Sequence, residues 1–297
     1  MKVSRLWTEL SNSLFQSIDP SALDDFRAPG GINRRLAAWD PQDRSLRYYK
    51  FLLFRVARQK SPAFYDLYRR LGPVDVGRPV SVSVEGCAIN IDHLFAVEEF
   101  EFLSRATDIG TLRTVLEIGA GFGRTAQALL MLTPAIERYV IIDLPEVLRL
   151  SRLYLKHILP PKVFAKLSFV NALDGIVDVV TPDLVINIDS FQEMPPETIA
   201  QYMRAPIAGA RAFYCKNPIG KYDPASVGIE VRDPAALADV FSLGRCTDVI
   251  DIFDEAALTG ARQRYVDAYR PGANWDAVAE SPMEMFPYLH HVLYRRT

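Results

Sequence analysis

Three glycines alternate at the end of a short apolar run, where a chain can bring main-chain amides close to a ligand. The run is Val115 to Ile118, and Gly119, Gly121 and Gly123 follow it before a helical pattern over 125–132. Glycine adopts backbone angles that are closed to other residues, and a helix N-terminus attracts anionic or polar groups. The stretch therefore predicts a cofactor-binding turn between a strand and a helix.

The spacing of these glycines indicates which classes of cofactor the turn is unlike. A dinucleotide-binding turn has its third glycine where the helix packs on the strand, and Arg124 occupies that position. A P-loop ends in Gly-Lys-Ser or Gly-Lys-Thr, and no such tripeptide follows these glycines. The spacing argues against a nicotinamide or flavin cofactor and against phosphoryl transfer.

An acid followed by alternating glycines, Glu117-x-Gly119-x-Gly121-x-Gly123, resembles motif I of class I methyltransferases. The resemblance implies S-adenosylmethionine (SAM) as the cofactor. Asp143 ends an apolar run 20 residues after Gly123, where this family holds the ribose hydroxyls with an acid. Together the two features indicate cofactor binding more strongly than the turn alone, which could be a simple tight connection.

Ligands of open α/β sheets collect at the carboxyl ends of the strands, so the residues that follow each strand are the candidates. The third tip, at Asn171 and Ala172, is where the family contacts adenine. The residues assigned to the cofactor are Glu117, Gly119, Ala120, Gly121, Gly123, Asp143, Leu144, Asn171, Ala172 and Asn187.

The residues after the fourth predicted strand resemble a narrower family within the class I methyltransferases. Its sequence, Asn187-x-Asp189-Ser-Phe-Gln-Glu193-Met, together with Asp143-Leu-Pro-Glu146 and the glycine turn, resembles a family of bacterial sugar O-methyltransferases over about residues 80–297. It lacks the Asn/Asp-Pro-Pro-Tyr/Phe sequence of enzymes that methylate the exocyclic amines of bases. The resemblance implies methyl transfer to a hydroxyl of a sugar or sugar-containing metabolite.

Such a transfer needs an in-line approach and a base that removes a weakly acidic proton. Asp189 and Glu193 are the candidate bases, although Glu193 could instead order the loop and Asp189 could bond a nearby amide. Gln192 stands where plant phenolic O-methyltransferases keep a catalytic histidine, which argues against the phenolic mechanism. Ser190, Gln192 and Arg124 are the residues expected to bind the acceptor.

The chain has four histidines. His93 lies near the elements expected to cover the cofactor, so it is a third candidate base. His157 is expected to be structural, and alternation along a terminal strand sends only one of His290 and His291 inward. No tight cluster of histidines and acids predicts a metal site.

Strands and helices alternate from about residue 111, which favours an α/β fold with a parallel sheet covered on both faces. The expected strands lie near 114–118, 138–142, 167–171, 183–188 and 211–216, with helices near 124–132, 146–158 and 196–205. Family likeness adds strands at 247–253 and 288–294, which completes a Rossmann-like, seven-stranded, mostly parallel sheet.

Two domains are expected: a helical N-terminal cap over 1–78 and a Rossmann-like SAM-binding methyltransferase domain over 79–297. Alternation over 80–84 and 88–91 predicts a small β-hairpin at the start of the second domain. Asp92 is the expected N-cap of the helix that follows.

Composition fits a soluble globular protein, with 49% hydrophobic and 24% charged residues among 297. Met1 to Phe15 lacks the apolar block of a signal peptide, and no run approaches the ~18 apolar residues of a membrane span. Three widely separated cysteines fit neither a disulfide framework nor a zinc site. We expect a reduced, cytoplasmic protein with a small-molecule sugar or glycosylated acceptor, no membrane partner, and a homodimer as one option.

Residues 27–70 carry eleven Lys or Arg against three Asp, a local balance of 11 − 3 = +8, with aromatic residues between them. One interpretation is a phosphate-facing surface, which would suit an RNA methyltransferase. The other, which we favour, is an amphipathic helix, because Tyr48, Phe51, Leu52 and Arg55 fall at helical spacing. We therefore expect no nucleic-acid partner, and keep a non-catalytic SAM-binding scaffold as a further alternative.

Overall fold

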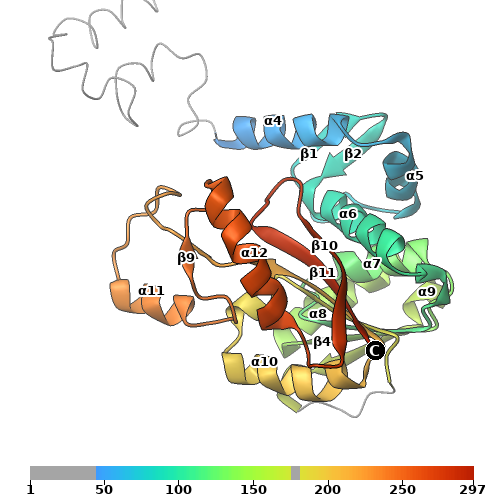
Figure 1. Cartoon of the computed structure of the whole chain (residues 1–297). Coiled ribbons are helices and arrows are strands. Elements are labelled where there is room, and N and C mark those ends of the chain that lie inside the picture. The colour runs from blue at the N-terminus through green and yellow to red at the C-terminus, as the bar shows by residue number, and fades with distance from the viewer. Residues whose placement is uncertain (1–44, 175–180) are drawn as a thin grey trace, which may run out of the picture.

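A computed structural model describes residues 45–174 and 181–297, and Figure 1 shows its arrangement. The cap predicted over 1–78 is therefore described only from residue 45, and Met1 to Phe15 lie outside the described residues. The α-helices are α4 (Ser45–Arg58), α5 (Pro62–Arg70), α6 (Ile91–Ala106), α7 (Arg124–Leu132), α8 (Pro145–Ile158), α9 (Pro161–Phe164), α10 (Pro196–Tyr202), α11 (Pro234–Phe241) and α12 (Glu255–Tyr269). The strands are β1 (Ser81–Val84), β2 (Cys87–Asn90), β3 (Thr114–Ile118), β4 (Arg138–Asp143), β5 (Leu167–Asn171), β6 (Leu184–Ile188), β7 (Ala212–Pro218), β8 (Lys221–Tyr222), β9 (Val249–Ile250), β10 (Trp275–Pro282) and β11 (Leu289–Arg296).

Seven strands form the central sheet in the order β10-β11-β7-β6-β3-β4-β5. The four pairs among β3 to β7 are parallel, whereas β11 runs antiparallel to both β7 and β10. The sheet is therefore mixed, and the prediction of a mostly parallel sheet is corrected. An antiparallel strand enters because the short connection from β10 to β11 returns the chain as a hairpin, whereas parallel neighbours need a long crossover.

Successive residues of the strands face opposite layers, as the twofold period of a strand requires. Val115 and Tyr139 pack with α6, α7 and α8, whereas Leu116 and Val140 pack with α10 and α12. Helices thus cover both faces (Figure 1) and the strands between them are almost wholly apolar. This sandwich holds the strand ends, and the loops that leave them, in fixed positions.

The predicted sixth strand is wrong. Only Val249–Ile250 of the 247–253 segment is a strand, and it pairs with β8 outside the main sheet. The strand beyond β11, at one edge of the sheet, is instead β10, whose residues alternate in burial from Trp275 onwards. A bulge between Ala277 and Ala279 shifts the register of β10 against β11.

The β1–β2 hairpin is confirmed, but Asn90 rather than Asp92 caps α6. The Asn90 side chain accepts a hydrogen bond from the His93 amide at 3.0 Å, so Asp92 falls inside the first turn. The helix predicted in the basic segment exists as α4, with a different buried stripe. Leu53 and Ala57 are fully buried, whereas the side chain of Leu52 is 43% exposed.

Candidate functional site

The order of strands reverses between β3 and β6, because β4 and β5 lie on one side of this pair and β7 on the other. Ligands of open α/β sheets bind outside the carboxyl ends of the strands at such a point. The glycine turn follows β3 there, and Asp189 and Ser190 follow β6. The topology therefore brings together the two segments that the sequence singles out.

The three glycines have different tasks, although each has a positive φ. A Cβ on Gly119 would stand 2.2 Å from the Ser190 hydroxyl, and one on Gly123 would stand 2.8 Å from Leu155. At Gly121 a Cβ would meet nothing within 4 Å. Two glycines thus allow close packing, and Gly121 borders the open space where a ligand would lie.

Asp143 stands across this space and is bonded to the turn. One carboxylate oxygen accepts from the Gly121 amide at 3.0 Å and the other from the Leu144 amide at 2.8 Å. Burial raises the pKa of Asp143, and these amides oppose the rise. Each oxygen keeps a lone pair for a further donor. Leu144 is 49% exposed beside it and offers an apolar surface.

Glu117 and Asn187 lie beneath the site instead of lining it. Glu117 is buried, accepts a 2.7 Å hydrogen bond from the Tyr139 hydroxyl, and has a pKa that burial raises to about 7. The Asn187 amide nitrogen donates to the Ile118 carbonyl at 3.0 Å and to Ser190. Both side chains support the loops that contact the open space.

At the third tip, Asn171 bonds within its own loop. Its amide nitrogen donates to Asp174 at 2.9 Å, and its side-chain oxygen accepts from the Leu173 amide. Ala172 packs against the core on the α10 and α12 side of the sheet. The two residues shape the edge of the site next to Asp143, with which Asn171 pairs across the strands.

Asp189 opens into a pocket of about 280 Å³, named the Asp189 pocket. The backbone of Asp189 has a φ of +59°, a costly conformation for a residue other than glycine, which Asn and Asp tolerate better than most. Gln192 donates a 2.5 Å hydrogen bond to its carboxylate. The pocket is lined by Asp189, Gln192, Glu193, Pro218, Gly220, Lys221, Tyr222, Val240, Phe241, Leu243 and Tyr288.

The electrostatic surroundings make Asp189 a weaker acid than usual. Desolvation raises its pKa to about 6; Glu193 adds to the rise, and Lys216 and Arg124 oppose it. A carboxylate with such a pKa accepts protons near neutral pH better than an ordinary aspartate. Glu193 also lines the pocket and is exposed.

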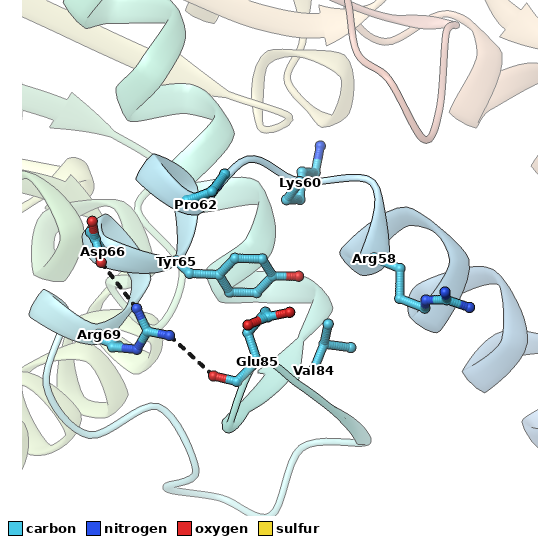
Figure 2. A pocket seen from close by; sticks show the side chains of 8 residues that line it. All are labelled: Arg58, Lys60, Pro62, Tyr65, Asp66, Arg69, Val84 and Glu85. Carbon is cyan, nitrogen blue, oxygen red and sulfur yellow. Dashed lines mark hydrogen bonds and ion pairs between the residues drawn. The ribbon is translucent and has the colours of Figure 1, made fainter.

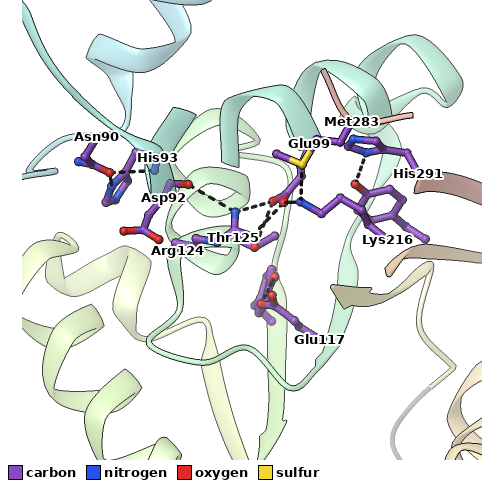
Figure 3. Close-up of polar contacts among 12 residues, drawn as sticks. Asn90, Asp92, His93, Glu99, Glu117, Arg124, Thr125, Lys216, Met283 and His291 are labelled. Atoms are coloured by element: carbon purple, nitrogen blue, oxygen red, sulfur yellow. Dashed lines mark hydrogen bonds and ion pairs between the residues drawn. The ribbon is translucent and has the colours of Figure 1, made fainter. Parts of the chain in front are cut away.

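The structure places Arg124 in an ion-pair cluster under the site (Figure 3). Arg124 donates to both Glu99 oxygens, at 2.8 and 2.9 Å, and Lys216 donates to one of the same oxygens. Burial alone would raise the pKa of Glu99, but the two cations hold it at about 2. The Arg124 guanidinium is thus engaged within the protein, and neither Glu99 nor Lys216 is among the residues predicted from the sequence. A lysine that ends the apolar run of β7 was the available signal for the second.

His93 is buried beneath the hairpin. One ring nitrogen lies 3.0 Å from the Asn90 side chain, and the other lies 2.9 Å from Gln127 and 3.2 Å from the Tyr154 hydroxyl. Burial lowers its pKa. The ring is thereby held in an internal network, and it does not line the Asp189 pocket. His290 and His291 are both buried, since helices cover both faces of their strand.

Several cations of the basic segment pair with acids or carbonyls of the protein. Figure 2 shows a second pocket, of about 370 Å³, between α5 and the hairpin. Arg69 there donates to Asp66 at 3.0 Å and to the Glu85 carbonyl at 3.1 Å. Lys60 lies 2.5 Å from Glu98 and also pairs with Glu284. This pairing reduces the positive charge available to a phosphate backbone.

Three further features concern metals, thiols and membranes. No group of three or more His, Cys, Asp or Glu side chains could hold a metal ion within residues 45–174 and 181–297. The three cysteines are free thiols. In the same part of the chain, every helix is too short or too polar to span a bilayer.

Several solved structures resemble this chain distantly. No protein-family model and no curated protein sequence matches the chain. The solved mitomycin 7-O-methyltransferase MmcR is similar with a TM-score of 0.44 and 15% identity, over 93% of this chain and 74% of MmcR. The glycopeptide N-methyltransferase MtfA, complexed with SAM, has a TM-score of 0.43 and 17% identity, over 80% of this chain and 98% of MtfA.

An O-methyltransferase family 2 protein from Planctomyces limnophilus, in complex with apigenin, gives a TM-score of 0.41 at 16% identity. The match covers 62% of this chain and about half, 51%, of that one. These solved structures are methyltransferases, but they are too distant to assign a substrate.

Proposed function

We propose that the protein is a SAM-dependent O-methyltransferase that acts on a hydroxyl of a sugar or sugar-containing metabolite. The observation that carries the proposal is the position of Asp189. Its carboxylate, with a pKa raised to about 6, lines a pocket at the same strand reversal as the glycine turn and Asp143. A proton acceptor thus lies beside a cofactor-binding turn.

The residues of the glycine turn and of the end of β4 are suited to different parts of SAM. Asp143 keeps lone pairs for the ribose hydroxyls, and Leu144 offers an apolar surface to the adenine. Gly123 caps α7 without a side-chain hydrogen bond, so the first-turn amides can receive the carboxylate. When bound, SAM supplies a methyl group on a positively charged sulfur, which an oxygen nucleophile can take.

The protein's own contribution is to hold the acceptor and take its proton. Asp189 would accept the proton of the acceptor hydroxyl as the oxygen forms its bond to the methyl carbon. Gln192 orients the carboxylate through the 2.5 Å hydrogen bond. Tyr222 and Tyr288 line the same pocket. Aromatic rings at such positions are surfaces on which the apolar face of a sugar can pack. Lys221, whose pKa burial lowers, adds a donor.

Calorimetric titration with SAM tests the cofactor site. Gly121→Arg fills the open space beside the turn, and Asp143→Ala removes the ribose acceptor, so both should abolish binding. Gly86→Arg is the matched control, because Gly86 also has a positive φ and open space but lies in the hairpin turn. Unchanged affinity in both site variants would refute the assignment.

Methyl transfer to a panel of glycosides, followed by mass spectrometry, tests the reaction. Product that is lost in Asp189→Asn, with SAM binding retained, supports the proposal. SAM binding without product from any glycoside favours the non-catalytic scaffold. Binding of RNA that weakens steeply with salt, together with methylated RNA, would replace the sugar acceptor with RNA.

A further inference from the structure

A third pocket, of about 640 Å³, shares Tyr288 with the Asp189 pocket. It lies between the first turns of α12 and the segment that joins β10 to β11, and we name it the Arg262 pocket. Apolar and aromatic side chains form most of its wall: Phe253, Leu258, Met285, Phe286 and Tyr288. Phe253 is 73% exposed, so an apolar surface remains open to a ligand.

Arg262 is the cation of this pocket. It lies on the same side of α12 as Leu258, four residues earlier. Its Nε is buried and has no hydrogen-bond partner, and no carboxylate in the described part of the chain pairs with its guanidinium. Glu255 lines the pocket but makes no ion pair with Arg262. The two terminal nitrogens of Arg262 are not buried, and no acceptor in the described part of the chain pairs with them. They are the donors that a ligand in this pocket would reach, and an acceptor placed there would be held by a charge-assisted hydrogen bond.

A neighbouring arginine on the same helix, Arg264, does have partners within the protein. Arg264, two residues further on, lies 3.0 Å from the Asp248 carboxylate and donates to the Gly260 carbonyl at 2.8 Å. Arg264 is therefore satisfied by the protein itself. Arg262, in contrast, has hydrogen-bond donors that no group in the described part of the chain accepts from, so a ligand could use them.

Tyr288 connects the two pockets, because its side chain lines both. Burial raises the pKa of Tyr288, and the charge of Asp189 adds to the rise, which places the two groups within electrostatic reach. Tyr288 therefore lies between the two pockets, and a ligand long enough to reach across it would meet Asp189 at one end and Arg262 at the other.

We infer that the Arg262 pocket binds an apolar or aromatic carboxylate carried by the acceptor. The inference rests on the proposed function, since it extends the acceptor that Asp189 would deprotonate. A planar guanidinium matches a carboxylate with two parallel hydrogen bonds, and the aromatic wall takes the attached apolar group. The acceptor would thus be a glycosylated acid, with the sugar at Asp189 and the acid at Arg262.

Phenylacetate is the probe, with neutral phenylacetamide as its isostere, and binding to the full chain is measured by ligand-observed NMR. Phenylacetate should bind more tightly than the amide. Arg262→Met should weaken the acid by roughly ten- to a hundredfold, the worth of a charge-assisted hydrogen-bond pair, and leave the amide unchanged. Arg264→Met is the matched control and should leave both unchanged. Arg262→Lys, which keeps the charge without the fork, should fall between.

Equal binding of acid and amide, or equal loss in the Arg262→Met and Arg264→Met variants, would overturn the inference. Titration with SAM separates this failure from failure of the proposed function. Retained SAM binding with no preference for phenylacetate rejects the Arg262 pocket alone. Phenylacetate binding that depends on Arg262 in a chain that does not bind SAM rejects the proposed reaction and keeps the carboxylate site.

Discussion

Gly119 lies so close to Ser190 that any side chain on the glycine would overlap the serine. The Ser190 hydroxyl also donates to the Ile118 carbonyl at 3.1 Å, so the loop after β6 is bonded to the end of β3. The cofactor turn and the loop that carries Asp189 are therefore one packed unit. A change in either loop must displace the other.

Gly119→Ala should reduce both stability and SAM affinity. The φ of +73° and the overlap with Ser190 together should cost about 2 kcal/mol or more. Ser190→Gly in the same chain should restore part of the loss, because it removes the overlapping atoms and leaves only the backbone strain. Urea unfolding and SAM titration of both variants measure this, and absence of any recovery would contradict the steric explanation.

The pH dependence of kcat/KM should identify the base. A base must be ionised, so log kcat/KM should rise with pH up to about 6, the pKa of Asp189, and level off above it. Asp189→Asn should lose activity at every pH. Glu193→Gln is the control: it removes a charge that raises the pKa of Asp189, so the midpoint should move to lower pH with activity retained. Loss of activity in Glu193→Gln alone would make Glu193 the base.

The parts of the fold that the sequence predicted are those set by local rules. The glycine turn, the strand that ends in Asp143 and the β1–β2 hairpin depend on backbone angles and short periods, which neighbouring residues determine. The same rules led to Asp92 as a helix cap. The prediction missed by two residues, because Asn90 and Asp92 are both good capping residues and only the structure selects between them.

The parts that the sequence could not predict depend on distant contacts. Glu99 and Lys216 are 117 residues apart, and they meet only because α6 packs over the end of β7. Arg124 sits beside the glycines, so its side chain was expected in the site, yet Glu99 holds it. Tyr288 reaches the Asp189 pocket from the connection between β10 and β11. The sequence predicts the strand before this connection at 247–253, whereas β10 begins 28 residues later, at Trp275.

Glu99→Gln should be strongly destabilising. It leaves the cations of Arg124 and Lys216 near one another with a neutral partner, and breaking a buried ion pair costs about 3–5 kcal/mol. Glu137→Gln is the matched control, because Glu137 forms an exposed pair with Arg113 at 3.6 Å, worth about 1 kcal/mol or less. The free energies of unfolding of the two variants should differ accordingly, and equal values would show that the cluster contributes little.

Glu117→Gln should change how stability depends on pH. Burial raises the pKa of Glu117 from 4.5 to about 7, so between these values the folded protein keeps a proton that the unfolded chain has released. The free energy of unfolding of the wild type should therefore fall as pH rises from about 4.5 to 7, by about 3 kcal/mol in total from this group. Glutamine mimics the protonated acid and removes that slope.

Urea unfolding from pH 5 to 8 measures the free energies of unfolding of the wild type and of Glu117→Gln. The difference between these free energies should grow with pH and level off above 7. A constant difference would mean that Glu117 is ionised throughout, held by Arg124 and the Tyr139 hydroxyl.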